Sequence, residues 1–494
     1  MNKFTKQKLI VHITPHVNGG LGGVLLSTLK NSITGNSIFR HELIITDRKP
    51  LSYKSLNKFN KFRKFIHINK SDVFTKKKII EADIVQVEFW NHPQIYEFLT
   101  SYEFPRTRLI ICNHINGLTR PQIITQNIIN FSDLFLSTSE VTKNHPLFKK
   151  KKNIHNLRKL KFVKFPIDLD RFKDIKKKTH DGFNVTYIGT LDYHKLHRSF
   201  LKMSDAIKIP KINFLICGDG DDKIEIEKES KKYSNNKFKF LGLVNDVKKI
   251  LEVTDVFGYP LNKNHYGTGE LVILEAMYSK IPVVTFSNYS EKVIIQNKKN
   301  GLLVKSINAY TEAIENLYYD KEKRKKIGLN GHKHIIENYS QSDCFNSLEK
   351  NYKKLMLKNK KLRIFKTKTL KNRKTYGSEL FIESLGNKAN EFLKSLKNNG
   401  KSINTKVNNI IKNSEVELKS KNKGSLFQYL YYFPKDPYLN FWAGLISLAD
   451  KNVLKNKYKS IPKSTYECFH NSLKLDKKNY EFKYFVKQEI KINK

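Results

Sequence analysis

Cysteine is scarce and dispersed in this sequence. The 494 residues contain four cysteines, and none of them forms a CxxC pair. They are Cys112, Cys217, Cys344 and Cys468. Such spacing argues against a disulfide framework and against a cysteine-based zinc site, and it is typical of proteins kept in a reducing cytosol. We therefore expect a cytoplasmic protein.

Long apolar runs are also lacking. No stretch approaches the ~18 apolar residues that a transmembrane helix needs. The N-terminal apolar run, residues 9–13, follows basic residues and contains His12, and it is too short for a signal peptide. We interpret it as the first buried strand.

Acidic residues are few relative to basic ones. The chain has 46 Asp and Glu against 92 Lys and Arg, which gives a formal net charge of +46. One interpretation is a general compositional bias that leaves a solvated basic surface. The other is attraction to a polyanion. Because no clustered aromatics accompany the basic stretches, we expect no nucleic-acid partner. An anionic membrane surface, at the inner face of the plasma membrane, is the polyanion that fits better.

Short apolar runs alternate with helix-like segments along most of the chain. This alternation predicts parallel sheets with helices on both faces, which bind ligands at the carboxyl ends of their strands. The expected strands are residues 9–14, 41–46, 84–89, 108–112, 133–137, 183–188, 212–217, 238–242 and 281–286, with a last short strand that ends at residue 304. We predict three domains: residues 1–164, residues 165–360, and a basic, mainly helical extension, residues 361–494. The first boundary follows the basic, poorly patterned stretch 149–161, and the residues 165–172 are the expected linker, in which Pro166 fixes the backbone.

Two glycine-containing segments point to a phosphate-bearing ligand. In the first, residues 15–23, a loop with four glycines joins the first strand to a helix-compatible run, and glycine lets a backbone approach a ligand closely. A tight turn is the alternative. In the second, a polar loop at 265–269 precedes an apolar helix, 271–277, that contains Glu275. Backbone N–H groups at the start of such a helix favour an anion.

Taken together, these blocks resemble the retaining glycosyltransferases of glycosyltransferase family 4, of the group 1 type. The resemblance covers roughly residues 8–357. It is carried by the glycine-rich loop, His114, the linker PIDLDRF, the segment FNVTYIGTLD, the segments FLICGDG and FLGLV, and the run GTGELVILEAM with IPVV and NGLLV. It implies an α/β chain of the GT-B fold, with two Rossmann-like domains facing a cleft, beside the helical extension.

The resemblance also assigns roles to individual residues. It implies that Glu275 binds the ribose of a nucleotide sugar, that Lys195 contacts the diphosphate, and that His114 lies near the transferred sugar. These three are the catalytic candidates. The candidates for donor binding are Gly22, Gly23, Thr190, Leu243, Thr268, Gly269, Glu270 and Leu271.

Two positions depart from the family pattern. The first glutamate of the Glu-x7-Glu motif is replaced by Gly267, and Glu270 follows three residues later. Thr190 stands where the family often has an arginine beside the diphosphate. The departures put the contact to the donor sugar, and one positive charge on the leaving group, in question.

The function implied by the resemblance is transfer of a hexose from a nucleoside diphosphate sugar, with retention of configuration and without an obligatory metal or cofactor. The acceptor would be a hydroxyl of a saccharide or lipid-linked saccharide, in the synthesis of a surface polysaccharide or glycoconjugate. The alternative is a catalytically impaired GT-B protein that binds an anionic membrane or nucleic acid through its basic surface. Gly267 and Thr190 favour this alternative.

Overall fold

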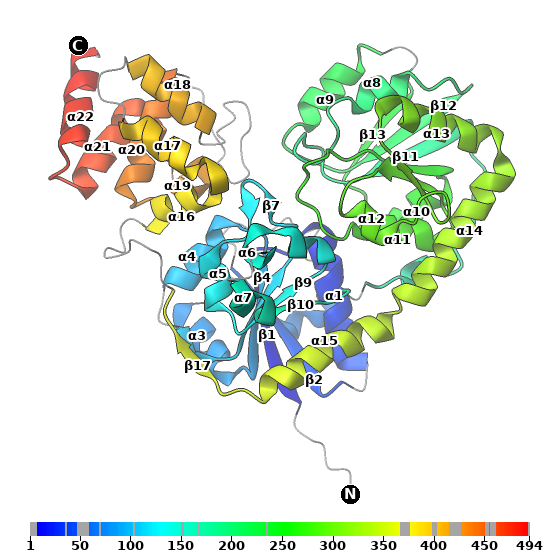
Figure 1. Cartoon of the computed structure of the whole chain (residues 1–494), viewed down its shortest axis with the longest axis horizontal. Helices are drawn as coiled ribbons and strands as arrows, with labels where there is room; N and C mark the ends of the chain where they lie inside the picture. The colour runs from blue at the N-terminus through cyan, green and yellow to red at the C-terminus, as the bar shows by residue number, and fades with distance from the viewer. Residues whose placement is uncertain are drawn as a thin grey trace, which may run out of the picture.

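The protein consists of two α/β lobes and a region of helices (Figure 1). The computed structural model describes residues 7–34, 37–46, 59–68, 71–101, 104–149, 153–165, 167–233, 236–365, 376–397, 403–413, 426–449, 454 and 461–492. Among the helices of the described residues, none is long and apolar enough to cross a membrane.

The first lobe is built on a seven-stranded parallel sheet with the order β10-β9-β6-β4-β1-β2-β3. Its strands are β1 (Lys8–Thr14), β2 (Phe39–Ile45), β3 (Ile66–Ile68), β4 (Ile84–Phe89), β6 (Leu109–Asn113), β9 (Leu134–Ser137) and β10 (Leu160–Phe162). The helices around it are α1 (Gly19–Thr34), α3 (Asp72–Glu81), α4 (Pro93–Ser101), α5 (Gln126–Phe131), α6 (Pro146–Lys149) and α7 (Ile154–Lys159). The central strands are nearly continuous apolar runs because both faces of the sheet are covered.

The second lobe contains a six-stranded parallel sheet with the order β13-β12-β11-β14-β15-β16. Its strands are β11 (Phe183–Ile188), β12 (Ile212–Cys217), β13 (Phe238–Gly242), β14 (Val256–Tyr259), β15 (Val283–Phe286) and β16 (Leu302–Val304). Its helices are α8 (Phe200–Asp205), α9 (Lys223–Ser230), α10 (Val247–Glu252), α11 (Leu271–Tyr278), α12 (Glu291–Ile294), α13 (Ile307–Tyr319) and α14 (Lys321–Asn338). The two sheets confirm the expected pair of Rossmann-like units.

After the second sheet the chain returns to the first lobe (Figure 1). On α15 (Gln341–Met356), the Tyr352 hydroxyl donates a hydrogen bond of 2.8 Å to Gln86 in β4, and its ring packs against Phe39. The following strand, β17 (Lys361–Arg363), pairs antiparallel with β5 (Phe104–Thr107). The shorter elements are β7 (Leu118–Thr119), β8 (Gln122–Ile123) and the 3-10 helices at Asn60–Phe65, Glu140–Asn144, Asp170–Phe172 and Gly386–Lys388.

The predicted helical extension is confirmed, and it packs on the first lobe. It comprises α16 (Tyr376–Ser384), α17 (Ala389–Lys397), α18 (Ile403–Asn413), α19 (Leu426–Tyr432), α20 (Pro437–Ala449), α21 (Thr465–Leu475) and α22 (Tyr480–Ile492). Gln428 on α19 contacts His92 at 3.1 Å, and Phe381 and Trp442 belong to the same apolar cluster as Phe89 in β4. The extension is therefore continuous with the core of the first lobe.

Two local expectations are wrong. The four glycines after β1 do not form a loop, because α1 begins at Gly19 and includes all of them. The stretch 149–161, expected to be unpatterned, contains α7 and the start of the edge strand β10, since Leu160 is buried against β9. Pro166, which was expected to fix the linker, lies outside the described residues.

Candidate active site

The carboxyl edges of the two sheets meet. The segment after β6 begins with His114, and the segment after β14 runs from residue 260 to α11. The backbone N–H of Asn116 donates to the Tyr266 carbonyl at 2.9 Å, and the Asn116 side-chain amide donates to the His265 carbonyl at 2.6 Å. These contacts place the predicted donor loop against the first lobe, at the edges where parallel sheets bind ligands.

The donor loop, residues 265–269, is held from both lobes. The Thr138 hydroxyl, just after β9, donates to the Thr268 hydroxyl at 2.6 Å, and Thr268 reaches the His114 carbonyl at 3.5 Å. From the second lobe, the Ser290 hydroxyl donates to the Gly267 carbonyl at 2.6 Å. The loop therefore enters α11 in a fixed conformation, which orients the free N–H groups at the start of that helix.

Lys195 forms a buried ion pair with Glu270. Lys195 Nζ lies 2.9 Å from Glu270 Oε2, and the Tyr259 hydroxyl donates to the same oxygen at 2.7 Å. Burial alone would raise the pKa of Glu270, but the charge of Lys195 and the hydrogen bonds from Tyr259 and Lys195 bring that pKa below its ordinary value. Burial opposes a charge on Lys195, and Glu270 nevertheless raises the pKa of Lys195. Both groups are charged, so a cation is positioned at the start of α11.

The Glu270 carboxylate lies where a side chain at residue 267 would begin. A Cβ atom at Gly267 would lie only 1.9 Å from Glu270 Oε1. The carboxylate thus folds back from the residue that precedes α11 to the position where a side chain at 267 would begin. Gly267 therefore leaves room for the Glu270 carboxylate, and a larger residue at this position would displace it.

Glu275 contacts an arginine from the linker between the lobes. It lies on α11, and Glu275 Oε1 forms an ion pair with Arg171 of the 3-10 helix Asp170–Phe172. The Glu275 side chain is 13% exposed, whereas that of Arg171 is 45% exposed. The guanidinium also lies 4.5 Å from the centre of the Phe172 ring. A cation thus covers the carboxylate that the resemblance assigns to ribose.

His114 belongs to a buried chain of hydrogen bonds. Its Nε2 lies 2.6 Å from Glu88 Oε2, and Glu88 Oε1 lies 2.7 Å from His12 Nδ1, whose ring contacts His41 at 2.8 Å. Burial would raise the pKa of Glu88, but the hydrogen bonds from His114 and His12 lower it to about 2. Because an ionised Glu88 only accepts, His114 Nε2 carries the donated hydrogen, and in the neutral ring Nδ1 is an acceptor.

An aromatic cluster lies beside this edge of the first sheet. Trp90 directly follows β4, and its ring centroid is 5.0 Å from that of His16 and 5.9 Å from that of His92. His92 in turn contacts Tyr432 of the helical extension at 5.4 Å. The extension therefore contributes a ring to the same side of the molecule as His114.

The structure separates the other predicted donor residues into two groups. Around Gly23 and Gly269 an added Cβ meets nothing within 4 Å, so both positions leave room for a ligand. At Gly22 an added Cβ would lie 2.1 Å from the Val17 carbonyl oxygen, so this glycine lets α1 pack against the segment that precedes it. Leu271, the first residue of α11, is approached from the first lobe by Gly20.

Among the described residues, neither Thr190 nor Leu243 has a direct hydrogen bond or ion pair with Lys195 or Glu270, and Thr190 reaches them through Tyr187, whose ring stacks on that of Tyr259 at 5.3 Å. Thr190 follows β11, and its carbonyl accepts a hydrogen bond of 2.9 Å from the Tyr187 hydroxyl. Leu243 follows β13 and is 74% exposed.

Sequence reasoning missed several residues that hold the site. Glu88 was predicted only as part of a strand, although a carboxylate in a buried strand signals a paired charge. Arg171 was quoted in the linker without a role. Asn116 and Thr138 carry no signal of their own, because their contacts depend on how the two lobes meet.

One group of side chains has the spacing of a metal site. The ligand atoms of Glu88, Cys112 and His114 all lie within 4.8 Å of one another. However, burial and the nearby Glu88 raise the pKa of the Cys112 thiol, whereas a metal binds the thiolate. The Glu88 oxygens are already bonded to two histidines. In this arrangement the group does not fit a metal.

Comparison with known protein families gives a match that includes part of this site. The family model for glycosyl transferases group 1 matches residues 168–334, a range that includes Arg171, Lys195 and the donor loop. No curated protein matches the chain at significance.

Several solved structures share the fold of most of this chain. Anabaena HepE in complex with UDP-glucose is 14% identical, with a TM-score of 0.57 over 70% of this chain and 99% of that one. The structure of S. aureus TarM with fondaparinux, alpha-GlcNAc-glycerol and UDP is 14% identical, with a TM-score of 0.55 over 71% of this chain and all of that one. A sucrose-phosphate synthase from Thermosynechococcus elongatus is 15% identical, with a TM-score of 0.54 over 71% and 99%. The chain has the GT-B fold of these glycosyltransferases.

Proposed function

We propose that this chain is a retaining hexosyltransferase that uses a UDP-hexose as donor. The observation that carries the proposal is the arrangement of charges along α11. Lys195 is fixed at the start of the helix by Glu270, and Glu275 lies on the same helix, facing the linker. This arrangement lies within the range matched by the group 1 model. UDP is the nucleotide in the complexes of HepE and TarM.

Each part of the site has a role in binding the donor. A carboxylate can accept hydrogen bonds from two vicinal hydroxyls, so Glu275 would bind the ribose once Arg171 shares or leaves it. The diphosphate would lie at the start of α11, where backbone N–H groups and Lys195 meet it. The open space around Gly269 allows the close approach that this requires.

Catalysis would come from stabilising the charge that develops on the diphosphate as the glycosidic bond breaks. Lys195 and the N–H groups at the start of α11 are positioned before the reaction, so little reorganisation is needed. Because these groups supply the positive charge, we propose a reaction that needs no metal. His114, held by Glu88, would accept a hydrogen bond from a hydroxyl of the transferred sugar through Nδ1.

The acceptor would be a saccharide. The rings of Trp90, His16 and Tyr432 offer flat apolar surfaces next to polar atoms, which suits the mixed apolar and hydroxyl faces of a sugar. We propose a polysaccharide or glycoconjugate as the acceptor, extended in the cytoplasm. The alternative of a catalytically impaired protein loses its main support, because the Glu270 carboxylate fills the position that Gly267 leaves empty.

The test is a screen of UDP-hexoses for transfer and for slow donor hydrolysis. The wild-type chain should release UDP from at least one donor, also with chelator present. The product should keep the anomeric configuration of the donor by NMR. Lys195→Ala should lower turnover at least about a hundredfold, whereas Lys305→Ala, an exposed lysine of the same lobe, should not. An inverted product, or equal turnover in both variants, would disprove the proposal.

A further inference from the structure

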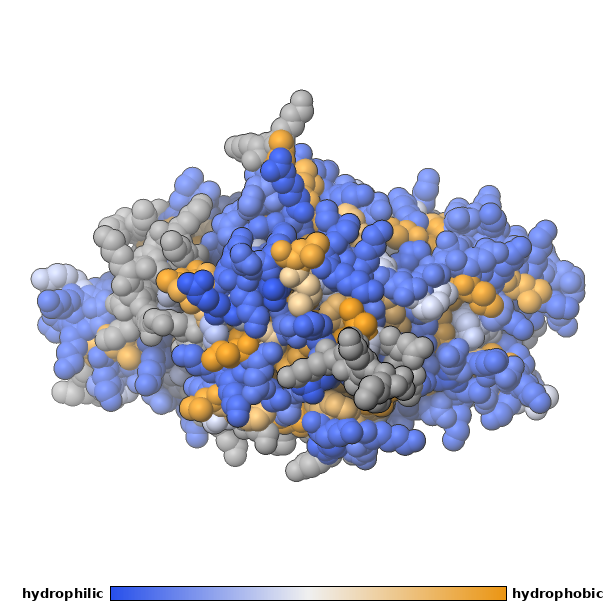
Figure 2. All heavy atoms as spheres, turned by 90° about the horizontal axis from the view of Figure 1, so that it is seen from below, coloured by the Kyte–Doolittle hydropathy of each residue, from blue (hydrophilic) through white to orange (hydrophobic). Residues whose placement is uncertain are grey.

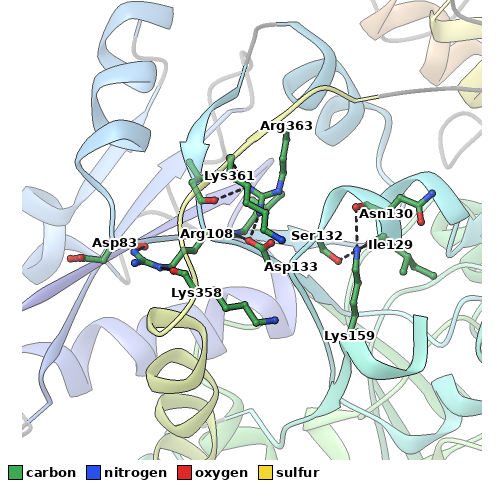
Figure 3. A network of polar contacts seen from close by, with 12 residues as sticks. Asp83, Arg108, Ile129, Asn130, Ser132, Asp133, Lys159, Lys358, Lys361 and Arg363 are labelled. Atoms are coloured by element: carbon green, nitrogen blue, oxygen red, sulfur yellow. Dashed lines mark hydrogen bonds and ion pairs between the residues drawn. The ribbon is translucent and has the colours of Figure 1, made fainter. Parts of the chain in front are cut away.

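A basic pocket lies at the amino edge of the first sheet, on the side opposite His114. Its volume is about 500 Å³. Three distant segments form it: the residues just before β9, helix α7, and the segment after α15 (Figure 3). We call it the amino-edge pocket. Its charged lining residues, besides the exposed His155, are Asp133, Arg158, Lys159, Lys358, Lys361 and Arg363.

Positive charge in this pocket is not balanced. Five cations face one carboxylate, which leaves four formal positive charges. That carboxylate is already used, since Asp133 forms an ion pair with Arg363 and accepts the Leu109 N–H at 2.9 Å. Figure 3 shows Asp133 and Arg363 at the centre of the network. An anion from outside is the partner that the pocket lacks.

The cations divide into fixed and available ones. Lys159 Nζ donates to the Ile129 carbonyl at 2.9 Å, and Arg363 donates to the Thr107 carbonyl at 2.7 Å. By contrast, Arg158, Lys358 and Lys361 are exposed, and within the described ranges their side chains have no hydrogen bond or ion pair.

The charges of Lys358 and Lys361 are close enough to lower the pKa of Lys159. Burial and the charges of Arg363, Lys361 and Lys358 lower the pKa of Lys159 to about 8, although Asp133 opposes the shift. A bound anion would relieve this repulsion.

Exposed aliphatic residues neighbour these cations along the chain. Leu357, Leu362 and Ile364, which flank Lys358 and Lys361, are 88%, 59% and 66% exposed. Ile154 and Leu157, which flank Arg158 on α7, are 54% and 40% exposed. The lower face of the molecule, where α15 and β17 lie in Figure 1, shows separate hydrophobic patches in a hydrophilic surface (Figure 2). We call Leu357, Leu362, Ile364, Ile154 and Leu157 the aliphatic rim.

The combination points to lipid. Aliphatic chains that enter the acyl boundary, beside Lys and Arg that meet phosphates, are typical of surfaces that lie on anionic membranes. A free phosphate would use the cations and leave the rim in water. Nucleic acid would be expected to meet aromatic rings for base stacking, and the rim is aliphatic.

We propose that the amino-edge pocket binds the headgroup of an anionic phospholipid, and that the aliphatic rim enters the membrane surface around it. The first lobe would then stand on the membrane with His114 facing away from it. The five residues of β6 separate the two edges by about 17 Å, at about 3.3 Å a residue for a parallel strand. An acceptor attached to that membrane would have to extend at least this far. The proposal does not depend on glycosyl transfer, because attachment needs no donor.

Vesicle co-sedimentation of the full chain tests it. Vesicles of phosphatidylcholine alone are compared with vesicles that also contain phosphatidylglycerol. Arg158→Gln/Lys358→Gln/Lys361→Gln removes the available charges, and Leu357→Ser/Leu362→Ser/Ile364→Ser removes part of the rim. The matched control, Lys321→Gln/Lys325→Gln/Lys326→Gln, removes the same charge from exposed positions on α14. Thermal unfolding verifies that each variant is folded, as expected for exposed positions.

The wild-type chain and the control should bind only the anionic vesicles, with affinities within about twofold of each other. The affinity of the charge variant for anionic vesicles should fall at least about tenfold. The affinity of the rim variant should fall several-fold, and its remaining binding should be more sensitive to salt. The proposal is overturned if the charge variant binds like wild type. It is also overturned if the rim variant binds like wild type while inorganic phosphate displaces the vesicles, since the site would then serve a soluble anion.

Discussion

The Glu270 carboxylate lies where the side chain of residue 267 would begin. Its Oε1 is 1.9 Å from the Cβ position of Gly267, while its Oε2 holds Lys195 at 2.9 Å. The glycine is therefore a condition for this ion pair, because any larger residue would displace the carboxylate.

Gly267→Ala should accordingly destabilise the chain. The added methyl group displaces Glu270 from a buried site, and overpacking of this kind typically costs about 1–3 kcal/mol. Urea unfolding measures the change. Gly269→Ala is the matched control for stability, because its Cβ would meet no atom within 4 Å. Equal free energies of unfolding for the two variants would show that Glu270 does not need the space at position 267.

Glu88→Gln should reduce turnover without reducing affinity for UDP. The amide keeps the size of the side chain but removes the charge that orients His114 through its Nε2. We expect kcat to fall about tenfold to a hundredfold, as for other groups that orient a functional histidine. Steady-state kinetics and UDP titration separate the two effects. A loss of UDP affinity with unchanged kcat would place Glu88 outside this role.

The same carboxylate predicts how stability depends on pH. The pKa of Glu88 is about 2 in the folded chain, against an ordinary value of 4.5. As pH falls, the unfolded chain therefore takes up the proton first. The stabilisation is complete above about pH 4.5 and is lost as pH falls to about 2, by up to roughly 3 kcal/mol. Urea unfolding at several pH values should show a steeper loss for wild type than for Glu88→Gln, and parallel curves would contradict this.

Trp90→Ala should weaken binding of the acceptor but not binding of the donor. Loss of the ring removes a flat surface between His16 and His92, so the KM for the acceptor should rise about tenfold, or ~1.4 kcal/mol. Trp90→Phe, which keeps a ring, should lie closer to wild type. Kinetics with varied acceptor at saturating donor provide the measurement. If the KM for the donor rose instead, the aromatic cluster would belong to the donor site.

Much of the fold is predictable because its strands are plain in the sequence. The run IVQVEF gives β4 to the residue, since a buried parallel strand is a short, nearly continuous apolar run. The prediction of a loop after β1 is wrong, because a segment with four glycines is typical of a loop, whereas residues 19–23 form the first turns of α1. The amino-edge pocket was not foreseen, because one of its walls, the segment after α15, comes more than a hundred residues after the other two and reaches them through the pairing of β17 with β5.

The charged residues of the candidate site could be predicted from the sequence, but the ion pairs that they form could not. Lys195 and Glu275 were selected by motif. Their partners, Glu270 and Arg171, depend on a backbone that folds back and on a linker that crosses between lobes. Spacing along the chain does not specify either contact.

Calorimetric titration of UDP tests the central claim most directly. The wild-type chain should bind UDP, and Glu275→Ala should bind it about tenfold to a hundredfold more weakly, because hydrogen bonds to a charged group are worth about 1.5–3 kcal/mol. Glu312→Ala, an exposed glutamate on α13, serves as the control and should bind like wild type. Equal affinities of Glu275→Ala and wild type for UDP, or no binding of UDP by the wild-type chain, would contradict the account.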